Sequence, residues 1–207
     1  MAKFPEPPDL RNVAADTVTL AEGTWLWRIY FQGGGHPTTW DGFRHYGPTT
    51  ARFDHHVDPP RVQERAILYG AHGKEAVTTC LAEVFQATRT IDRTARAPWL
   101  VGFPLTRVLC LLDLAGDWPT QAGASMAINS GPRPRARRRS RAIHAAYADI
   151  DGLLYASSMH ENAPCVALYE RAQNALANAP DFHRSLADPA LGPRLNTAAN
   201  RLSYALV

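Results

Sequence analysis

An apolar run that breaks at a glycine turn and resumes as an amphipathic helix fills residues Ala66–Phe85. The run Ile67–Tyr69 predicts a short strand that ends at Gly70. From Val77 onward, apolar residues recur at i, i+4, i+7 and i+8, which predicts one buried helix face. Glu83 lies off this face among small side chains that leave room for a ligand. A lone helix glutamate is usually a solvated surface residue, so its interpretation depends on the rest of the chain.

Length and charge place the chain among single-domain globular proteins. Its 207 residues are enough to bury a core, and 22 basic against 19 acidic residues give a formal charge of +3. This balance fits neither an acidic disordered chain nor a histone-like one. The N-terminal residues lack the apolar stretch of a secretion signal, and no run of about eighteen apolar residues occurs. We therefore expect a cytoplasmic protein without a membrane span.

The three cysteines, Cys80, Cys110 and Cys165, are widely scattered. They match neither a zinc-ligand spacing nor a disulfide framework. We interpret them as reduced, mostly buried thiols, and we expect neither a metal site nor a bound cofactor.

Two arginines are embedded among aromatic residues. Arg28 lies inside Thr24–Tyr30, an aromatic segment that predicts a strand, and Arg52 precedes a phenylalanine. A guanidinium in such a strand needs an anion or a fork of acceptors. Arg28 is therefore either a paired arginine at a sheet edge or an anion-binding group in a cleft. Residues 33–48 between the arginines predict a long loop of the kind that often carries function.

The second half of the chain predicts more strands. Val108–Leu114 is mostly apolar and predicts a buried strand, while Leu153–Ser157 and Cys165–Tyr169 predict a hairpin with a longer loop. Residues 1–19 are interpreted as an N-terminal arm, and residues 20–207 as a single domain.

An arginine block, defined as Pro132–Arg141, holds six arginines and two prolines in ten residues. Such a block predicts an exposed, mobile loop followed by a helix that Ser140 caps. Two other interpretations are a phosphate-contacting patch and a dock for an acidic partner. A nucleic-acid-binding protein that uses this block is a further hypothesis, although no nucleic-acid-binding motif accompanies it.

Five separated features occur in an order that resembles the RES-domain family. They are WRIY with Arg28, ARF with Arg52, ILYGA with Tyr69, CLAEVF with Glu83 and GLLYAS with Ser157. The family is named after an arginine, a glutamate and a serine, which correspond here to Arg28, Glu83 and Ser157. Its members are toxins of bacterial toxin–antitoxin pairs. The arginine block resembles an insertion into this domain.

The resemblance implies an α+β fold similar to ADP-ribosyltransferase toxins, with a mixed, mainly antiparallel β core split around a cleft and flanked by helices. It implies NAD⁺ as a substrate rather than a cofactor. By the match, Arg28, Glu83 and Ser157 are the candidate catalytic residues. Arg52 and Tyr69 are the candidate substrate-binding residues.

Tyr30 is an alternative to Tyr69 as the aromatic wall for the nicotinamide ring. The expected reaction is cleavage of the nicotinamide–ribose bond, with phosphate or water as acceptor; the alternative is transfer of ADP-ribose to a protein. Protein-modifying relatives often carry an acidic residue two positions before the glutamate, where this chain has Leu81, which favours a small acceptor. The resemblance also implies a cognate antitoxin that blocks the cleft, with nucleic acid contacted only through that antitoxin.

Overall fold

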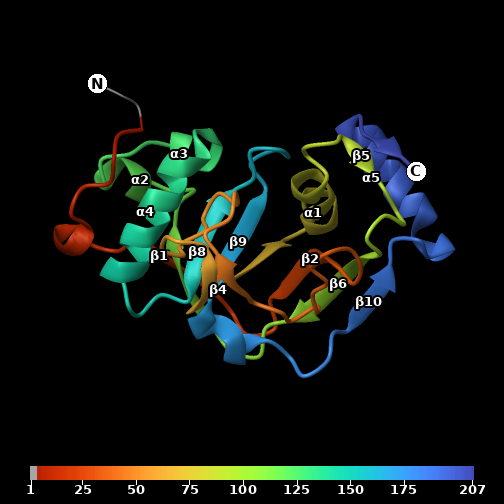
Figure 1. Cartoon of the computed structure of the whole chain (residues 1–207), viewed down its shortest axis with the longest axis horizontal. Helices are drawn as coiled ribbons and strands as arrows, with labels where there is room; N and C mark the ends of the chain where they lie inside the picture. The colour runs from red at the N-terminus through yellow and green to blue at the C-terminus, as the bar shows by residue number, and fades with distance from the viewer. Residues whose placement is uncertain (1–3) are drawn as a thin grey trace.

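The computed structural model describes residues 4–207, so the first three residues of the expected N-terminal arm lie outside the described residues. One nine-stranded sheet dominates the fold, and helices pack along it (Figure 1). The strands are β1 (Thr17–Leu20), β2 (Trp25–Phe31), β3 (Arg44–Gly47), β4 (Arg61–His72), β5 (Thr90–Ile91), β6 (Pro98–Pro104), β7 (Leu109–Asp113), β8 (Gly152–Ala156), β9 (Pro164–Tyr169), β10 (Phe182–Ser185) and β11 (Ala205–Leu206). The helices are α1 (Ala76–Val84), α2 (Trp118–Gln121), α3 (Ala127–Ser130), α4 (Arg133–Ala146) and α5 (Gly192–Leu202), with short 3₁₀ turns at Leu10–Asn12, Glu170–Ala175 and Pro189–Leu191.

The large sheet has the strand order β1-β7-β8-β9-β4-β2-β6-β10, and β3 pairs with β4 outside this path. All its pairings are antiparallel except that of β7 with β8. The two short strands β5 and β11 form a separate parallel pair. The predicted α+β fold with a mixed, mainly antiparallel β core is therefore confirmed.

The sheet splits between β2 and β4. These strands pair only at Leu26 with His72 and at Trp27 with Ala71, whereas β2 pairs with β6 along its whole length. Gly70 lies at the end of this short ladder, where a Cβ atom would lie 3.1 Å from the Trp27 carbonyl oxygen. Beyond that point β2 stays with β6 and β4 stays with β9, so the gap between them opens into a cavity.

Apolar side chains pack on both faces of the sheet. Alternate residues of β9 enter different clusters, with Ala167 and Tyr169 in the larger cluster and Val166 and Leu168 in the smaller one. Figure 1 shows α2, α3 and α4 grouped at one end of the molecule, α5 at the other end, and α1 between them near β2 and β4. Within residues 4–207, the structure contains no helix long and apolar enough to cross a membrane.

Several sequence predictions were too short or missed an element. The strand expected at Ile67–Tyr69 is longer, because β4 runs from Arg61 to His72. Its first half is largely exposed, carries charged residues and pairs with β3. The predicted long loop at residues 33–48 ends in strand β3. Strands β6 and β10 were not predicted, since tertiary pairing outweighs their weak local pattern. The predicted strand at Val108–Leu114 and the predicted hairpin are confirmed as β7 and as β8 with β9.

The N-terminal segment packs against the domain. Phe4 and Leu10 are buried in the larger apolar cluster, and Thr17–Leu20 forms the edge strand β1 on β7. The boundary expected between residues 19 and 20 therefore falls inside a strand.

The prediction of a mobile loop for the arginine block is wrong. The segment forms most of α4, which begins at Arg133. Proline is tolerated in the first helical turn, where backbone N–H groups have no partner in the helix, and arginine is a good helix former. Ser140 does not cap a helix, because it lies inside α4 and its hydroxyl donates to the Phe53 carbonyl at 2.7 Å.

The arginines of α4 avoid mutual repulsion by reaching separate acceptors. Arg135 donates to the Phe4 carbonyl, Arg138 pairs with Glu6, and Arg139 is fully buried against backbone carbonyls. Several guanidinium groups of the arginine block are therefore occupied by hydrogen bonds or ion pairs within the molecule.

Candidate active site

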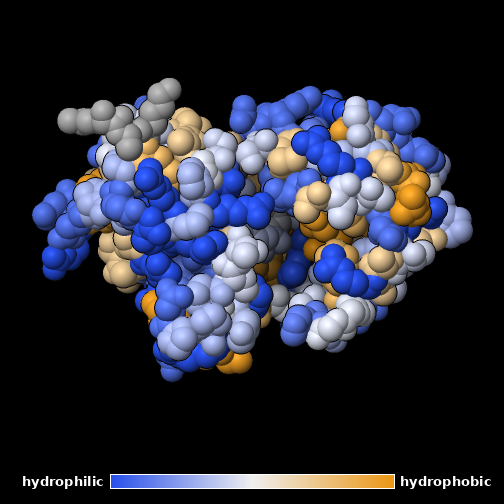
Figure 2. All heavy atoms as spheres, turned by 45° about the horizontal axis from the view of Figure 1, so that its top comes forward, coloured by the Kyte–Doolittle hydropathy of each residue, from blue (hydrophilic) through white to orange (hydrophobic). Residues whose placement is uncertain are grey.

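A cavity of about 500 Å³ lies where β2 and β4 separate. Figure 2 shows the molecule hollowed between its two halves. The lining comes from β2, the start of β3, the loop before β4, β4 itself, α1, the start of α4 and the end of β8. Among the described residues, four arginines line it against a single carboxylate, that of Glu83. The cavity is therefore suited to an anionic ligand.

Glu83 and Ser157 meet at one end of the cavity. The Ser157 hydroxyl donates to Glu83 Oε1 at 2.6 Å, joining α1 to the end of β8. Ser157 is itself buried, and its oxygen accepts from the backbone N–H groups of Met159 and His160 at 3.2 and 3.1 Å. The serine is therefore held in one orientation and fixes the carboxylate, so the structure brings these two predicted residues together.

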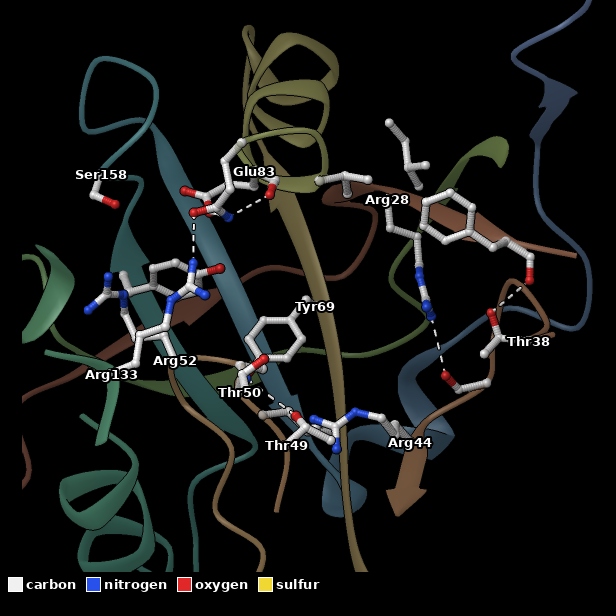
Figure 3. A pocket seen from close by; sticks show the side chains of 18 of the residues that line it. Arg28, Thr38, Arg44, Thr49, Thr50, Arg52, Tyr69, Glu83, Arg133 and Ser158 are labelled. Atoms are coloured by element: carbon white, nitrogen blue, oxygen red, sulfur yellow. Dashed lines mark hydrogen bonds between the residues drawn. The ribbon is translucent and has the colours of Figure 1, made fainter. Parts of the chain in front are cut away.

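Gln86, three residues after Glu83 and just beyond the end of α1, connects the carboxylate to the arginine block. Its Nε2 atom lies 2.6 Å from the Glu83 carbonyl and 3.4 Å from Glu83 Oε2. Arg133, the first residue of α4, donates to Gln86 Oε1 at 2.8 Å. In Figure 3, Arg133 and Arg52 lie side by side next to Glu83, across from Ser158.

Arg28 lies on the opposite side of the cavity from Arg52 (Figure 3). Its Nη1 donates to the Trp40 carbonyl at 2.9 Å and makes a longer contact with the Gly42 carbonyl at 3.4 Å. Burial lowers the pKa of Arg28 to about 10. Among the described residues no carboxylate forms a salt bridge with it, and its Nε has no hydrogen-bond partner. A partly buried guanidinium held only by carbonyls favours the anion-binding interpretation over that of a paired arginine.

Arg52 and Tyr69 also line the cavity, as predicted. Arg52 Nη1 donates to the Gly131 carbonyl at 2.6 Å, and burial lowers the pKa of its guanidinium. Figure 3 shows the ring of Tyr69 between the Glu83 end and the Arg28 side. Burial raises the pKa of this phenol, so it stays neutral.

Tyr30 does not line this cavity. Its ring is buried in the smaller apolar cluster, and its hydroxyl contacts His183 Nε2 and accepts from Gln32 at 2.8 Å. The alternative assignment of Tyr30 as the aromatic wall therefore finds no support in its position.

Sequence reasoning missed several residues that the cavity gathers. Arg44 lies at the end of the segment predicted as a functional loop, and Arg133 opens the arginine block, for which a phosphate-contacting role was one interpretation. Tyr155 and Ser158 flank the predicted serine. No local sequence pattern distinguishes these residues from other polar side chains. They line one cavity only because the sheet splits between β2 and β4.

A second cluster of titratable groups lies outside the cavity. Ligand atoms of His55, His144 and Glu170 lie within 4.8 Å of one another, as the ligands of a metal ion would. The guanidinium of Arg171 lies 3.3 Å from His144 Nε2 and 3.8 Å from the Glu170 carboxylate, and its positive charge opposes a cation there. Burial lowers the pKa of His55 to about 4, so the buried ring is neutral at pH 7.

Fold and site together define an α+β protein whose split sheet carries an arginine-lined cavity with one carboxylate. A family model described as the RES domain matches residues 26–188, and the chain belongs to this family, as the sequence resemblance predicted. A chain in the crystal structure of the M. tuberculosis MbcT–MbcA toxin–antitoxin complex superposes with a TM-score of 0.56 at 17% identity, over 86% of this chain and 92% of that one. At that identity the likeness concerns the fold. No curated protein matches the sequence.

Proposed function

We propose that this protein is the toxin of a toxin–antitoxin pair and that it degrades NAD⁺ by cleaving the nicotinamide–ribose bond. The observation that carries the proposal is the Glu83–Ser157 pair, a carboxylate fixed at 2.6 Å by a buried hydroxyl at one end of an arginine-lined cavity. Membership of the RES domain family and the fold shared with a chain of a toxin–antitoxin complex support the toxin role.

The shape and charge of the cavity fit a dinucleotide. A pyrophosphate needs forked cationic donors, and guanidinium groups meet phosphate oxygens through two parallel hydrogen bonds. Arg28 and Arg52 line the space from opposite sides, and each can supply such donors. Tyr69, which lines the same cavity, offers a flat neutral ring as a wall for the nicotinamide.

Breaking the nicotinamide–ribose bond develops positive charge on the sugar. A fixed carboxylate stabilises that charge more than it stabilises bound NAD⁺, so Glu83 lowers the barrier of this step. Glycoside hydrolysis uses carboxylates against the same kind of charge. Ser157 acts as a positioning residue for Glu83, because its hydroxyl donates to that carboxylate.

The acceptor of the ADP-ribose group in this proposal is water or phosphate. Protein-modifying relatives often place a second acidic residue two positions before the glutamate; here Leu81 is fully buried in the apolar core. This favours a small acceptor over the alternative, transfer to a protein. The arginine block gives little support to a nucleic-acid-binding function, since Arg135, Arg138 and Arg139 bond within the molecule.

The proposed partner is an antitoxin whose segment fills the cavity mouth and thereby protects the host from unrestrained loss of NAD⁺. A net positive charge of +3 would speed its encounter with an acidic segment. Nucleic acid would then be reached only through the antitoxin.

The test is to incubate pure protein with NAD⁺ labelled in the adenosine, with and without phosphate, and to identify the products. Release of nicotinamide together with ADP-ribose, or with its phosphorylated form when phosphate is present, is the expected result. Glu83→Gln, which keeps the side-chain shape and removes the charge, is the inactive control. Intact NAD⁺ after prolonged incubation with the folded wild-type protein would refute the proposal, and label on a protein would favour the transfer reaction.

A further inference from the structure

Arg44 occupies a β-bulge beside the cavity. Arg44 pairs with Ile67 on β4, but the register then shifts, so that Tyr46 pairs with Val62. Bulges re-aim side chains and are common next to active sites. Here the bulge directs Arg44 to the cavity, which Ile67 also lines. Figure 3 places Arg44 next to Thr49 and Thr50, away from the Glu83 end.

Asp54 holds Arg44 and the loop at Thr49 in place. The carboxylate is fully buried and lies 3.0 Å from Arg44 Nη1. It accepts four hydrogen bonds, from the backbone and hydroxyl of Thr49 at 2.6 and 2.7 Å and from the backbone and ring Nδ1 of His56 at 3.0 and 2.6 Å. One buried group thus fixes both the arginine and the loop that follows it.

One nitrogen of the Arg44 guanidinium donates no hydrogen bond to the described part of the chain. Arg44 Nη1 contacts Asp54 and the Tyr46 carbonyl, but Nη2 is buried without a hydrogen-bond partner in the described part of the chain. A buried donor without a partner is unfavourable unless a ligand supplies the acceptor. Thr50 is exposed on the same wall and offers a hydroxyl next to it.

We propose that Arg44 and Thr50 form a phosphate-binding subsite at the opposite end of the cavity from Glu83, and that Asp54 is the positioning residue of this subsite. The ligand class is a phosphate or phosphoanhydride group carried by the substrate. The inference deepens the proposed function and rests on it for the identity of the whole substrate, but the anion site itself stands on the geometry of Arg44 and Asp54.

The test measures binding before turnover. Isothermal titration with ADP, and separately with inorganic pyrophosphate, compares wild type with Arg44→Gln, Arg44→Lys and Asp54→Asn. The matched control is Arg61→Gln, which removes the same charge from an exposed position on β4 that does not line the cavity. The dissociation constant for ADP should rise by about ten-fold or more in Arg44→Gln, and Arg44→Lys should recover part of this loss. Arg61→Gln should bind like wild type.

Asp54→Asn distinguishes positioning from general stability. An amide cannot accept from Arg44, Thr49 and His56 together, so binding of ADP should weaken even in protein that circular dichroism shows to be folded. On NAD⁺ the variant should raise KM and change kcat by less than roughly two-fold, as expected for a group that acts on binding. If Asp54→Asn unfolds, Arg44→Gln against Arg61→Gln decides the question alone.

The outcomes separate this inference from the proposed function. ADP binding that depends on Arg44 in a protein that leaves NAD⁺ intact would keep the subsite and remove the proposed reaction. NAD⁺ cleavage with ADP binding equal in Arg44→Gln and Arg61→Gln would overturn the subsite alone. Weaker binding in folded Asp54→Asn but not in Arg44→Gln would overturn it too, because the aspartate would then act without the arginine.

Discussion

Replacing Arg139 by methionine should destabilise the protein because this arginine ties α4 to two other segments. It is fully buried, and its terminal nitrogens donate to the carbonyls of Ala122, Gly123, Pro5 and Glu6 at 3.1, 3.1, 3.2 and 3.3 Å. Methionine fills much of the same space and removes the donor from those four carbonyls. Pro5, Glu6 and Gly123 are exposed, so water can replace the donor there, whereas Ala122 is buried. A buried orphan acceptor costs about 1 kcal/mol at the lower end of the usual range.

The orphan acceptor of Ala122 would cost about 1–3 kcal/mol, which is partly offset because the variant no longer buries a guanidinium. We therefore expect the free energy of unfolding to fall by about 1–2 kcal/mol. Urea unfolding followed by tryptophan fluorescence measures this quantity, with the m-value checking that the transition stays two-state. Arg137→Met is the matched control, since Arg137 lies on the same helix without a hydrogen bond or ion pair in the described structure, and it should change stability by less than about 0.5 kcal/mol. Equal midpoints for the two variants would refute the proposed anchoring role.

Three further predictions concern the site and the histidine cluster. Glu83→Gln should lower NAD⁺ turnover by about a hundred-fold or more while calorimetry still detects NAD⁺ binding; near-normal turnover would remove the carboxylate from the mechanism. Arg28→Lys should weaken NAD⁺ binding by about ten-fold or more, because lysine lacks the planar fork, and unchanged binding would return Arg28 to a purely structural role. Burial lowers the pKa of His55 from 6.5 to about 4 in the folded protein. Between pH 6.5 and pH 4 the unfolded chain therefore binds a proton that the folded protein does not. The free energy of unfolding should therefore fall by up to about 3 kcal/mol from pH 7 to pH 4, and a His55→Phe variant with an equally steep profile would contradict this assignment.

The local elements of the site were readable from the sequence because their signals are local. Periodicity predicted the helix that carries Glu83 to within two residues of α1, and the apolar runs separated by turn residues predicted the hairpin whose first strand leads to Ser157. Both arginines that the family motif marks, Arg28 and Arg52, line the cavity. Tyr30 is two residues from Arg28 in the same strand, yet it packs in the apolar cluster, which no local pattern indicates.

The arginine block shows where local reasoning fails. Net charge and proline content predict repulsion and exposure, but α4 forms because acceptors far away in the sequence meet its arginines one by one. The acceptor of Arg135 is the carbonyl of Phe4, which is 131 residues distant along the chain. Such compensation depends on the complete fold.

The sequence by itself pointed to the family through the order of its motifs, which are properties of neighbouring positions, and the resemblance then implied the fold class and the three residues that name the family. Only the tertiary structure decided that β2 and β4 part after two residue pairs, that Ser157 holds Glu83, and that Arg44 and Arg133 join the cavity. The physical reason is that side-chain direction at a split in a sheet depends on which strands pair and where the pairing stops. That choice is made by burial and hydrogen bonding summed over distant segments.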